Sequence, residues 1–236
     1  MPSSLFCNAV SPALIWTGRQ GPLTLHAGRV AKGEGMDEAE WLSCTDPTPM
    51  LEFLRTSGRA SDRKLRLFAV GCSRRVWDWL DAVGRAAVEV AEMYADGQAS
   101  ADQLRAARLA CKFAGGSAAW YAAASNPAVA ARNAALSAQA VPGLPAERTV
   151  QAALLRDITG SPFRGGPVIG PWGDGTVREM AEAVYAERDF SRPRLAALAQ
   201  GLERAGCADT DLLDHLRGPG PHSRGCFVVD ALLGNS

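Results

Sequence analysis

Apolar side chains recur every three or four residues along most of the chain after residue 36, which is the spacing of helices that bury one face. No segment alternates apolar and polar positions over the length of a strand. The pattern therefore predicts an all-α protein, a multi-helix orthogonal or bundle-like array of about eight or nine helices. The stretch 159–175 lacks this period and is rich in Gly and Pro, which predicts one long loop packed against the helices.

Capping residues place the ends of several helices. Thr48 is expected to cap a helix that begins at Pro49, and Ser100 with Gln103 resembles a capping box. Asn126 before Pro127 marks another start. The remaining boundaries follow from the apolar period, and the predicted helices span residues 37–44, 61–79, 85–96, 100–125, 127–140, 146–158, 176–188, 192–205, 209–216 and 223–233.

The chain divides into four predicted parts: a leader of residues 1–35, an N-terminal helical region 36–158, the loop 159–175, and a C-terminal helical region 176–236 packed on the first as one domain. The leader has no apolar period. Lys32 to Gly35 directly precede Met36. The codons for these residue types are rich in purines, as is a bacterial ribosome-binding site. We therefore expect a disordered leader and a natural start at Met36.

Charge and cysteine content narrow the function classes. The charges of the 25 basic and 25 acidic side chains cancel, so the protein as a whole is not expected to bind polyanions such as nucleic acids. The six cysteines are scattered, which is typical of reduced thiols in a cytoplasmic protein and not of a secreted disulfide framework. The sequence has no continuous apolar run long enough to span a membrane, so no membrane partner is expected.

Basic side chains are concentrated in 55–75 and acidic ones in 76–103. One interpretation is that the two segments pair with each other or are solvated. The other is a binding surface for an anion, an acidic protein or nucleic acid, formed by Arg63, Arg66, Arg74 and Arg75.

Rare residue types gather in the segment 207–226, and three interpretations of them stay open. Cys207, His215, His222 and Cys226 are zinc-ligand types, but their spacing matches no standard zinc finger. His222 and Cys226 lie four apart, which would put them on one face of a helix starting near Pro221, as the nucleophile pair of a hydrolase-like enzyme. The third interpretation makes the cysteines core residues and His222 a cap or hydrogen-bond centre, with no cofactor.

Four segments carry a family resemblance: 41–54 (WLSCTDPTPMLEFL), 60–68 (ASDRKLRLF), 155–164 (LRDITGSPFR) and 218–234 (GPGPHSRGCFVVDALLG). They resemble a family of uncharacterised bacterial proteins that is numerous in planctomycetes. The similarity begins at Met36, as expected for a start there, and the resemblance implies no catalytic residue. We therefore expect a noncatalytic helical interaction or regulatory module with a protein as its partner. The alternative is a metal-dependent or Cys/His enzyme centred on His222 and Cys226.

Overall fold

The structure is a computed structural model that describes residues 35–114, 117–144, 146–167, 170 and 175–235. Twelve α-helices and two 3-10 helices form in these ranges, with no strand among them, so the all-α prediction is confirmed. The count exceeds eight or nine, and three of the helices have only five to seven residues. The predicted leader lies outside the described residues except for Gly35, and so do positions 168, 169 and 171–174 of the predicted loop.

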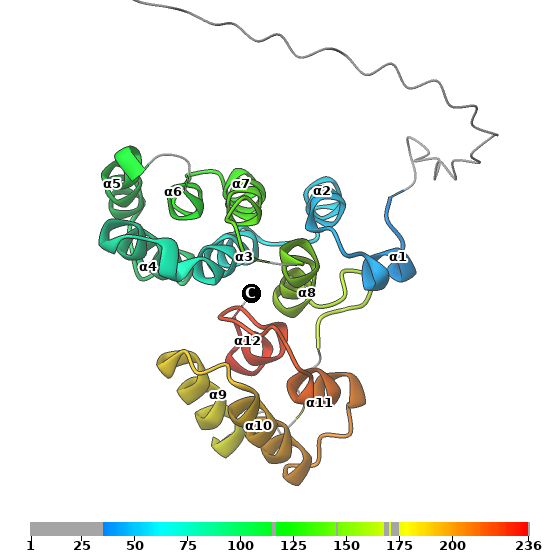
Figure 1. Cartoon of the computed structure of the whole chain (residues 1–236). Helices are drawn as coiled ribbons and strands as arrows, with labels where there is room; N and C mark the ends of the chain where they lie inside the picture. Colours follow the sequence, from blue (N-terminus) through cyan, green and yellow to red (C-terminus); the bar gives the residue numbers. More distant parts are fainter. Residues whose placement is uncertain (1–34, 115–116, 145, 168–169, 171–174, 236) are drawn as a thin grey trace, which may run out of the picture. The chain divides into compact units, whose positions relative to one another are not determined.

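The helices follow one another along the chain without any intervening strand in the described ranges (Figure 1). Their bounds are α1 Glu38–Ser43, α2 Pro47–Ser57, α3 Asp62–Arg75, η1 Trp77–Trp79, α4 Ala82–Ala95, α5 Ala101–Ala110, η2 Cys111–Ala114, α6 Ala118–Ala122, α7 Pro127–Gln139, α8 Glu147–Thr159, α9 Gly175–Glu187, α10 Arg192–Arg204, α11 Thr210–Arg217 and α12 Phe227–Leu233.

Local capping chemistry explains several helix starts. Ser100 and Gln103 form the predicted capping box, and Asn126 accepts from the amide of Val129 ahead of α7. The predicted cap at Thr48 is wrong. Asp46 caps α2 by accepting from the Thr48 amide, and Pro47 takes the first helical position, because an aspartate directly before a proline is the stronger start signal.

Three predicted helices are shorter than the apolar period suggested. The helix over 61–79 ends at Arg75, since Val76 leaves helical geometry and a 3-10 turn follows. The segment 100–125 is divided into α5, η2 and α6, with Ser117 as a new cap. The last helix begins at Phe227 and not at 223, because Gly225 has φ +97°, which a helix does not allow.

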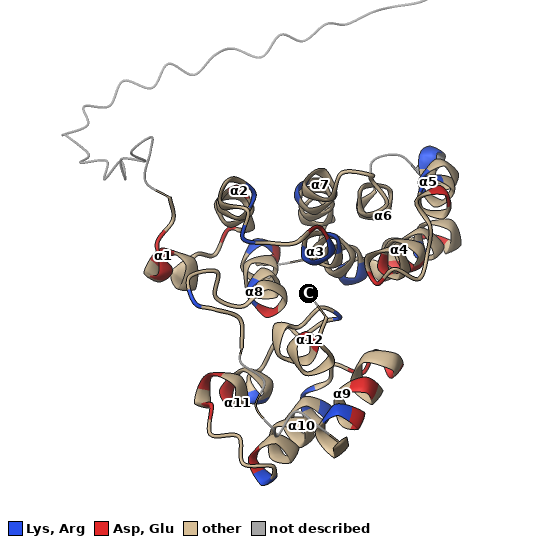
Figure 2. Ribbon diagram, turned by 180° about the vertical axis from the view of Figure 1, so that it is seen from behind, with Lys and Arg blue, Asp and Glu red and all other residues tan. Residues whose placement is uncertain are grey.

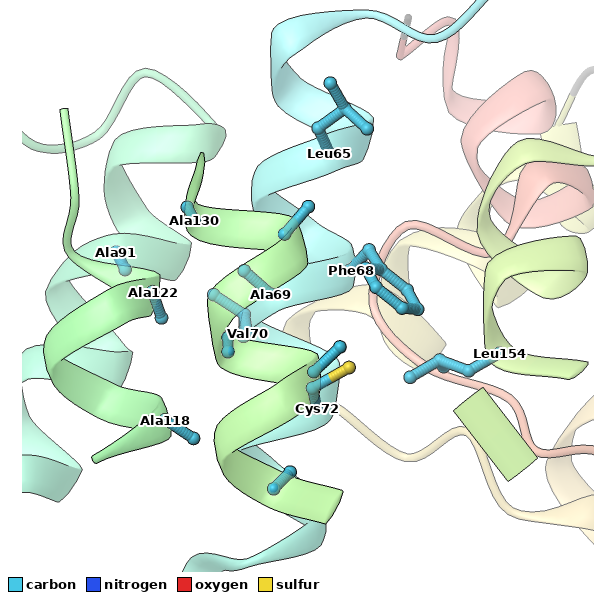
Figure 3. Packing of buried hydrophobic residues seen from close by; sticks show 14 of the residues in the cluster. Leu65, Phe68, Ala69, Val70, Cys72, Ala91, Ala118, Ala122, Ala130 and Leu154 are labelled. Carbon is cyan, nitrogen blue, oxygen red and sulfur yellow. The ribbon is translucent and has the colours of Figure 1, made fainter. Parts of the chain in front are cut away.

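Helix α3 lies at the centre of the N-terminal core, where α7, α6, α4 and α8 pack around it. Small side chains on α6 and α7 let these helices approach α3 closely, as Figure 3 shows for Ala122 and Ala130. On another side of α3, Gly71 leaves room for Leu154 of α8: a Cβ atom at Gly71 would lie 2.9 Å from Leu154 Cδ2. The largest fully buried members of this core are Trp41, Met50, Leu54, Phe68, Leu155 and Ile158.

Helices α9 to α12 form a C-terminal core of their own. It contains Leu195, Leu198, Leu202, Leu216, Val228 and both Cys207 and Cys226. Helix α12 contacts α9 and also α8, so it connects the two cores (Figure 1). Residues Gly35–Ser236 form one compact unit. None of the helices in the described ranges is long and apolar enough to cross a bilayer.

Acidic and basic helices pair inside this unit. Helix α3 contains five basic residues, and the neighbouring α4 contains Glu89 and Glu92 and has Asp96 as its C-cap (Figure 2). Arg74 binds the buried Glu92 at 2.9 Å, and Arg63 binds Asp96 at 2.9 Å. These two contacts fit the interpretation that the two charged segments pair with each other or are solvated.

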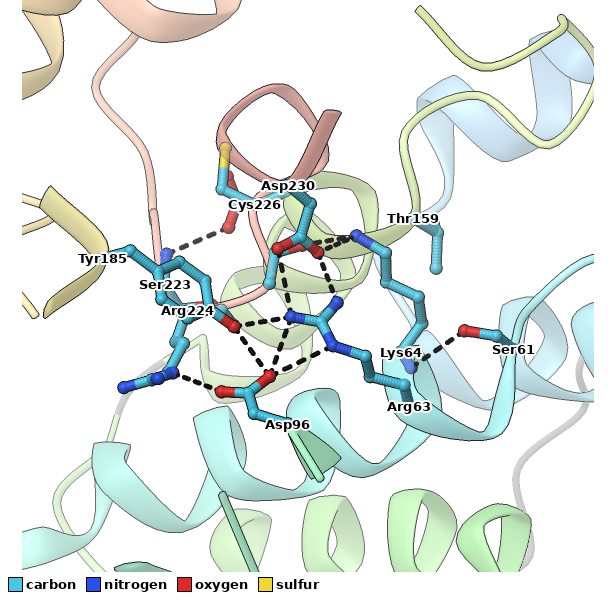
Figure 4. A network of polar contacts seen from close by, with 12 residues as sticks. Ser61, Arg63, Lys64, Asp96, Thr159, Tyr185, Ser223, Arg224, Cys226 and Asp230 are labelled. Carbon is cyan, nitrogen blue, oxygen red and sulfur yellow. Dashed lines mark hydrogen bonds and ion pairs between the residues drawn. The ribbon is translucent and has the colours of Figure 1, made fainter. Parts of the chain in front are cut away.

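A buried polar network joins α3 and α4 to the C-terminal helices (Figure 4). Asp230 of α12 accepts from Arg63 at 2.7 Å and pairs with Lys64. Tyr185 of α9 donates to Asp96 at 2.8 Å, and Arg224 binds the other oxygen of Asp96 at 2.7 Å. The network therefore fixes how α9 and α12 dock against α3.

Candidate metal centre

Four side chains with metal-ligating atoms converge where α8 meets the C-terminal helices. Asp157 comes from α8, His215 from α11, His222 from the turn between α11 and α12, and Cys226 from the residue that precedes α12. One potential ligand atom of each lies within 4.8 Å of all the others. Three separate segments of the chain are thus joined at one point.

The contacts within this group are short. Asp157 Oδ1 lies 2.8 Å from His222 Nδ1 and 3.1 Å from His215 Nε2. His215 Nε2 also lies 3.4 Å from Cys226 Sγ. The second oxygen of Asp157 accepts from the backbone amide of Ser223 at 3.0 Å, which fixes the orientation of the carboxylate.

Local sequence explains how the four side chains are positioned. Asp157 lies three residues after Leu154 and one before Ile158, on the buried side of α8. His215 lies in the strongly amphipathic α11, between the buried Leu213 and Leu216. His222 lies in the turn between α11 and α12. This turn can be tight because Gly220 has φ +82°, in a region that L side chains rarely adopt.

Asp157 is a buried carboxylate, 2% exposed, and among the described residues no lysine or arginine pairs with it. Burial alone would raise the pKa of Asp157, but hydrogen bonds to His215 and His222 and the charges of these rings hold it below its ordinary value. A buried carboxylate needs a compensating positive charge. Among the described residues, the two imidazole rings, or a cation bound between them, can supply it.

The same buried environment shifts the pKa values of Cys226 and His222. Burial, and then the charge of Asp157, raise the pKa of the Cys226 thiol well above its usual value. Burial would lower the pKa of His222, but the hydrogen bond to Asp157 and its charge, with a smaller effect of the Gly218 carbonyl, raise it. Both shifts favour the protonated forms, so an ion that binds there competes with protons.

Four side-chain ligand atoms around one point could form a closed tetrahedral site. Bond lengths of about 2.0 to 2.3 Å from zinc to N, O and S imply ligand-to-ligand separations of about 3.3 to 3.6 Å. Of the three contacts within the group, the one of 3.4 Å lies in this range, whereas those of 2.8 and 3.1 Å are shorter and are hydrogen-bond distances. All four ligand atoms lie within 4.8 Å of one another, so an ion would bind after small shifts of the side chains. A thiolate and a carboxylate with two neutral imidazoles would also cancel the charge of a divalent ion. The group can therefore hold zinc.

The structure brings together three of the four residues that the sequence marked as metal ligands. His215, His222 and Cys226 meet, whereas Cys207 is outside the group and is packed in the C-terminal core. Asp157 was missed. The sequence feature that could have revealed Asp157 is an acidic residue on the apolar face of a predicted helix, because Leu154, three residues earlier, lies on that face.

The geometry does not favour a nucleophile pair of His222 and Cys226. The Cys226 thiol is fully buried, and its pKa is raised, whereas reactive thiols are accessible and have a lowered pKa. The imidazole within hydrogen-bonding distance of Sγ belongs to His215 and not to His222. The two residues also do not share a helix face, because His222 lies in a turn.

The four arginines proposed as a binding surface all have internal partners. Arg66 is buried and donates to the carbonyls of Ala122, Ala124 and Ser125, so it is not part of a surface. The other three bind carboxylates: Arg63 binds Asp96 and Asp230, Arg74 binds Glu92, and Arg75 binds Glu147. Binding of an acidic partner or of nucleic acid by all four together stays an untested prediction.

A scan against known protein-family models finds no match, and neither a search of curated proteins nor one of solved structures finds a similar chain. Function is therefore inferred from the residues and their geometry.

Proposed function

We propose that this protein is a noncatalytic zinc-binding protein in which one buried ion joins α8 to α11 and α12. The observation that supports this is the convergence of Asp157, His215, His222 and Cys226, with their ligand atoms all within 4.8 Å of one another. The expectation of a helical interaction or regulatory module fits this role, and the identity of its protein partner stays a prediction.

Four protein ligands favour a structural ion. Catalytic zinc sites have three protein ligands and leave the fourth position to water or substrate, whereas structural sites are closed. Here Asp157, His222 and Cys226 are nearly or fully buried, which leaves little access for a substrate. The ion would thus stabilise the docking of the C-terminal helices and would not activate water.

Zinc content and a matched pair of cysteine variants test the proposal. The purified full-length protein should contain about one zinc per chain by elemental analysis, and the chelated protein should take it up again. Cys226→Ala should weaken zinc binding by at least about 100-fold, more than loss of a residue that only orients a ligand. Cys207→Ala removes another buried thiol from the same core and should leave zinc binding unchanged.

Two results would contradict the proposal. One is a chelated wild-type protein that takes up no zinc in a titration, in which case Asp157 is compensated by a protonated His222 alone. The other is Cys226→Ala that binds zinc as tightly as the wild type. Blocked reaction of Cys226 with a thiol reagent in the zinc-loaded protein, relieved by a chelator, would support the proposal independently.

A further inference from the structure

A pocket of about 450 Å³ is formed by α4, α5, η2 and α6. One of its walls is a single face of α5, continued into η2, because its members recur at helical spacing. These members are Ala101, Leu104, Arg105, Arg108, Leu109 and Lys112. The rest of the described lining is Tyr94, Trp120, Ala123 and Ser125. None of these residues is a proposed zinc ligand, so the zinc proposal does not use this pocket.

Much of the pocket lining is apolar or aromatic. Leu104 and Ala123 are buried, and the rings of Tyr94 and Trp120 are half-buried. Leu109 is 68% exposed, the largest exposed fraction of any large apolar side chain in the described ranges. A pocket of this volume with such a lining is typical of sites for small apolar ligands, which need a few polar groups to orient them.

The polar groups of this pocket are cations. Three of them line it, and among the residues that the structure describes no carboxylate does. Arg105 pairs with Asp102 on the exposed side of α5. Arg108 and Lys112 form no ion pair or hydrogen bond with any described residue, unlike the arginines of α3. Two positive charges at the pocket are therefore left without a carboxylate partner.

Arg108 is held in a fixed position by Trp120. Its guanidinium carbon lies 4.2 Å from the centroid of the indole ring, as in a cation–π contact. Trp120 is itself packed edge-on against Tyr121, with ring centroids 4.8 Å apart. Contact with a ring face orients the guanidinium group and leaves its N–H groups available to a carboxylate. The position that would bind an anion is therefore formed before the ligand arrives.

Charged and apolar members are separated along the α5 wall. Arg108 and Lys112 lie at its C-terminal end, whereas Ala101 and Leu104 lie toward its N-terminal end. At about 1.5 Å per residue, Arg108 is about 10 Å along the helix from Ala101. A ligand that matches this arrangement has a negative group at one end and an apolar body.

We propose that this pocket binds an anionic amphiphile, namely a carboxylate with a single hydrocarbon chain of medium length. The carboxylate would accept hydrogen bonds from Arg108 and Lys112. The chain would contact Leu104, Tyr94 and Ala123. A neutral or cationic amphiphile of the same length would leave both positive charges without a partner.

Octanoate is the probe, and titration calorimetry with the full-length protein is the assay. Octanoate should bind with a Kd of about 1 mM or tighter. Hexanoate should bind about 15-fold more weakly, because each buried CH₂ group contributes a factor of about four. 1-Octanol should bind about tenfold more weakly or less, since it has no charged group to accept from the two cations.

Variants of the two cations separate recognition of the carboxylate from recognition of the chain. Lys112→Gln should fold, because Lys112 is exposed and has no partner among the described residues, and it should weaken octanoate binding by about fivefold. The double variant Arg108→Gln with Lys112→Gln should weaken it by about tenfold or more. Neither should change the affinity for 1-octanol, which reports whether the apolar part of the pocket is intact.

Arg178→Gln is the matched control, because Arg178 lies on α9, has a half-exposed side chain and pairs with Glu182. It should bind octanoate as the wild type does. Every variant should also keep its zinc content, so a failure here and a failure of the zinc proposal are distinguishable.

Four results would overturn the proposal. Octanoate at about 10 mM shows no saturable binding, or 1-octanol binds as tightly as octanoate. Hexanoate and octanoate bind equally well, which would indicate an anion held at the surface without its chain. The double variant binds octanoate like the wild type. If octanoate fails and a glutamate-rich peptide binds only when Arg108 and Lys112 are present, the pocket belongs to an acidic protein partner instead.

Discussion

Removal of zinc should lower the melting temperature of the protein by about 8 to 16 °C. An ion that binds only the folded chain, at a free concentration of about 1,000 times its Kd, adds about 4 kcal/mol to the free energy of unfolding. For a chain of this size each kcal/mol corresponds to about 2 to 4 °C. The chelated protein should still fold, because two hydrophobic cores of apolar side chains stabilise it and hydrogen bonds to His215 and His222 can compensate the buried Asp157.

The assay is calorimetric melting of zinc-loaded and chelated protein, with hydrogen exchange to locate the change. Protection of backbone amides in α11 and α12 should fall on chelation, since the ion holds these helices to α8. Helices α3 and α7 contribute no ligand and should keep their protection. Cys226→Ala should melt at the same temperature with and without zinc, whereas Cys207→Ala should keep the full shift. Equal melting of loaded and chelated wild-type protein would refute the reasoning.

Three other changes have expected outcomes of defined sign. Asp230→Asn removes a buried charge that pairs with two cations and should lower the free energy of unfolding, measured in urea, by about 3 to 5 kcal/mol. Gly225→Ala should also destabilise the protein, by more than about 1 kcal/mol, because φ is +97° and a Cβ would lie 2.9 Å from Leu67 Cδ1. Zinc affinity, measured by chelator competition, should fall as pH falls, since His222 and Cys226 both have raised pKa values and hold their protons.

Controls separate the causes of these effects. Asp102→Asn breaks an exposed ion pair on α5 and should change the free energy of unfolding by no more than about 0.5 kcal/mol. Gly97→Ala has φ +72° but no atom near its Cβ, so it gives the cost of the backbone conformation without the clash. An equal loss at Gly97 and Gly225 would contradict the steric argument, and a flat pH profile of zinc affinity would contradict the proton competition.

The fold class could be predicted from the sequence because the signals that decide it are local. The Ser100–Gln103 box and the Asn126 cap depend only on residues within three positions, and the structure contains both. The break at Val76 could not be predicted in the same way. Val76 is buried at the helix end, so the apolar period continues through it although the helix does not. Tertiary packing there outweighs the periodic pattern.

The candidate site was only partly predictable for a related reason. His215, His222 and Cys226 are rare residue types within twelve positions of one another, so composition alone singles them out. Asp157 is a common residue type 58 positions before His215, and its role depends on α12 docking against α8. The partners of the α3 arginines were unpredictable for the same reason, because Arg75 binds Glu147, which lies 72 positions later in the sequence. No local pattern encodes such contacts.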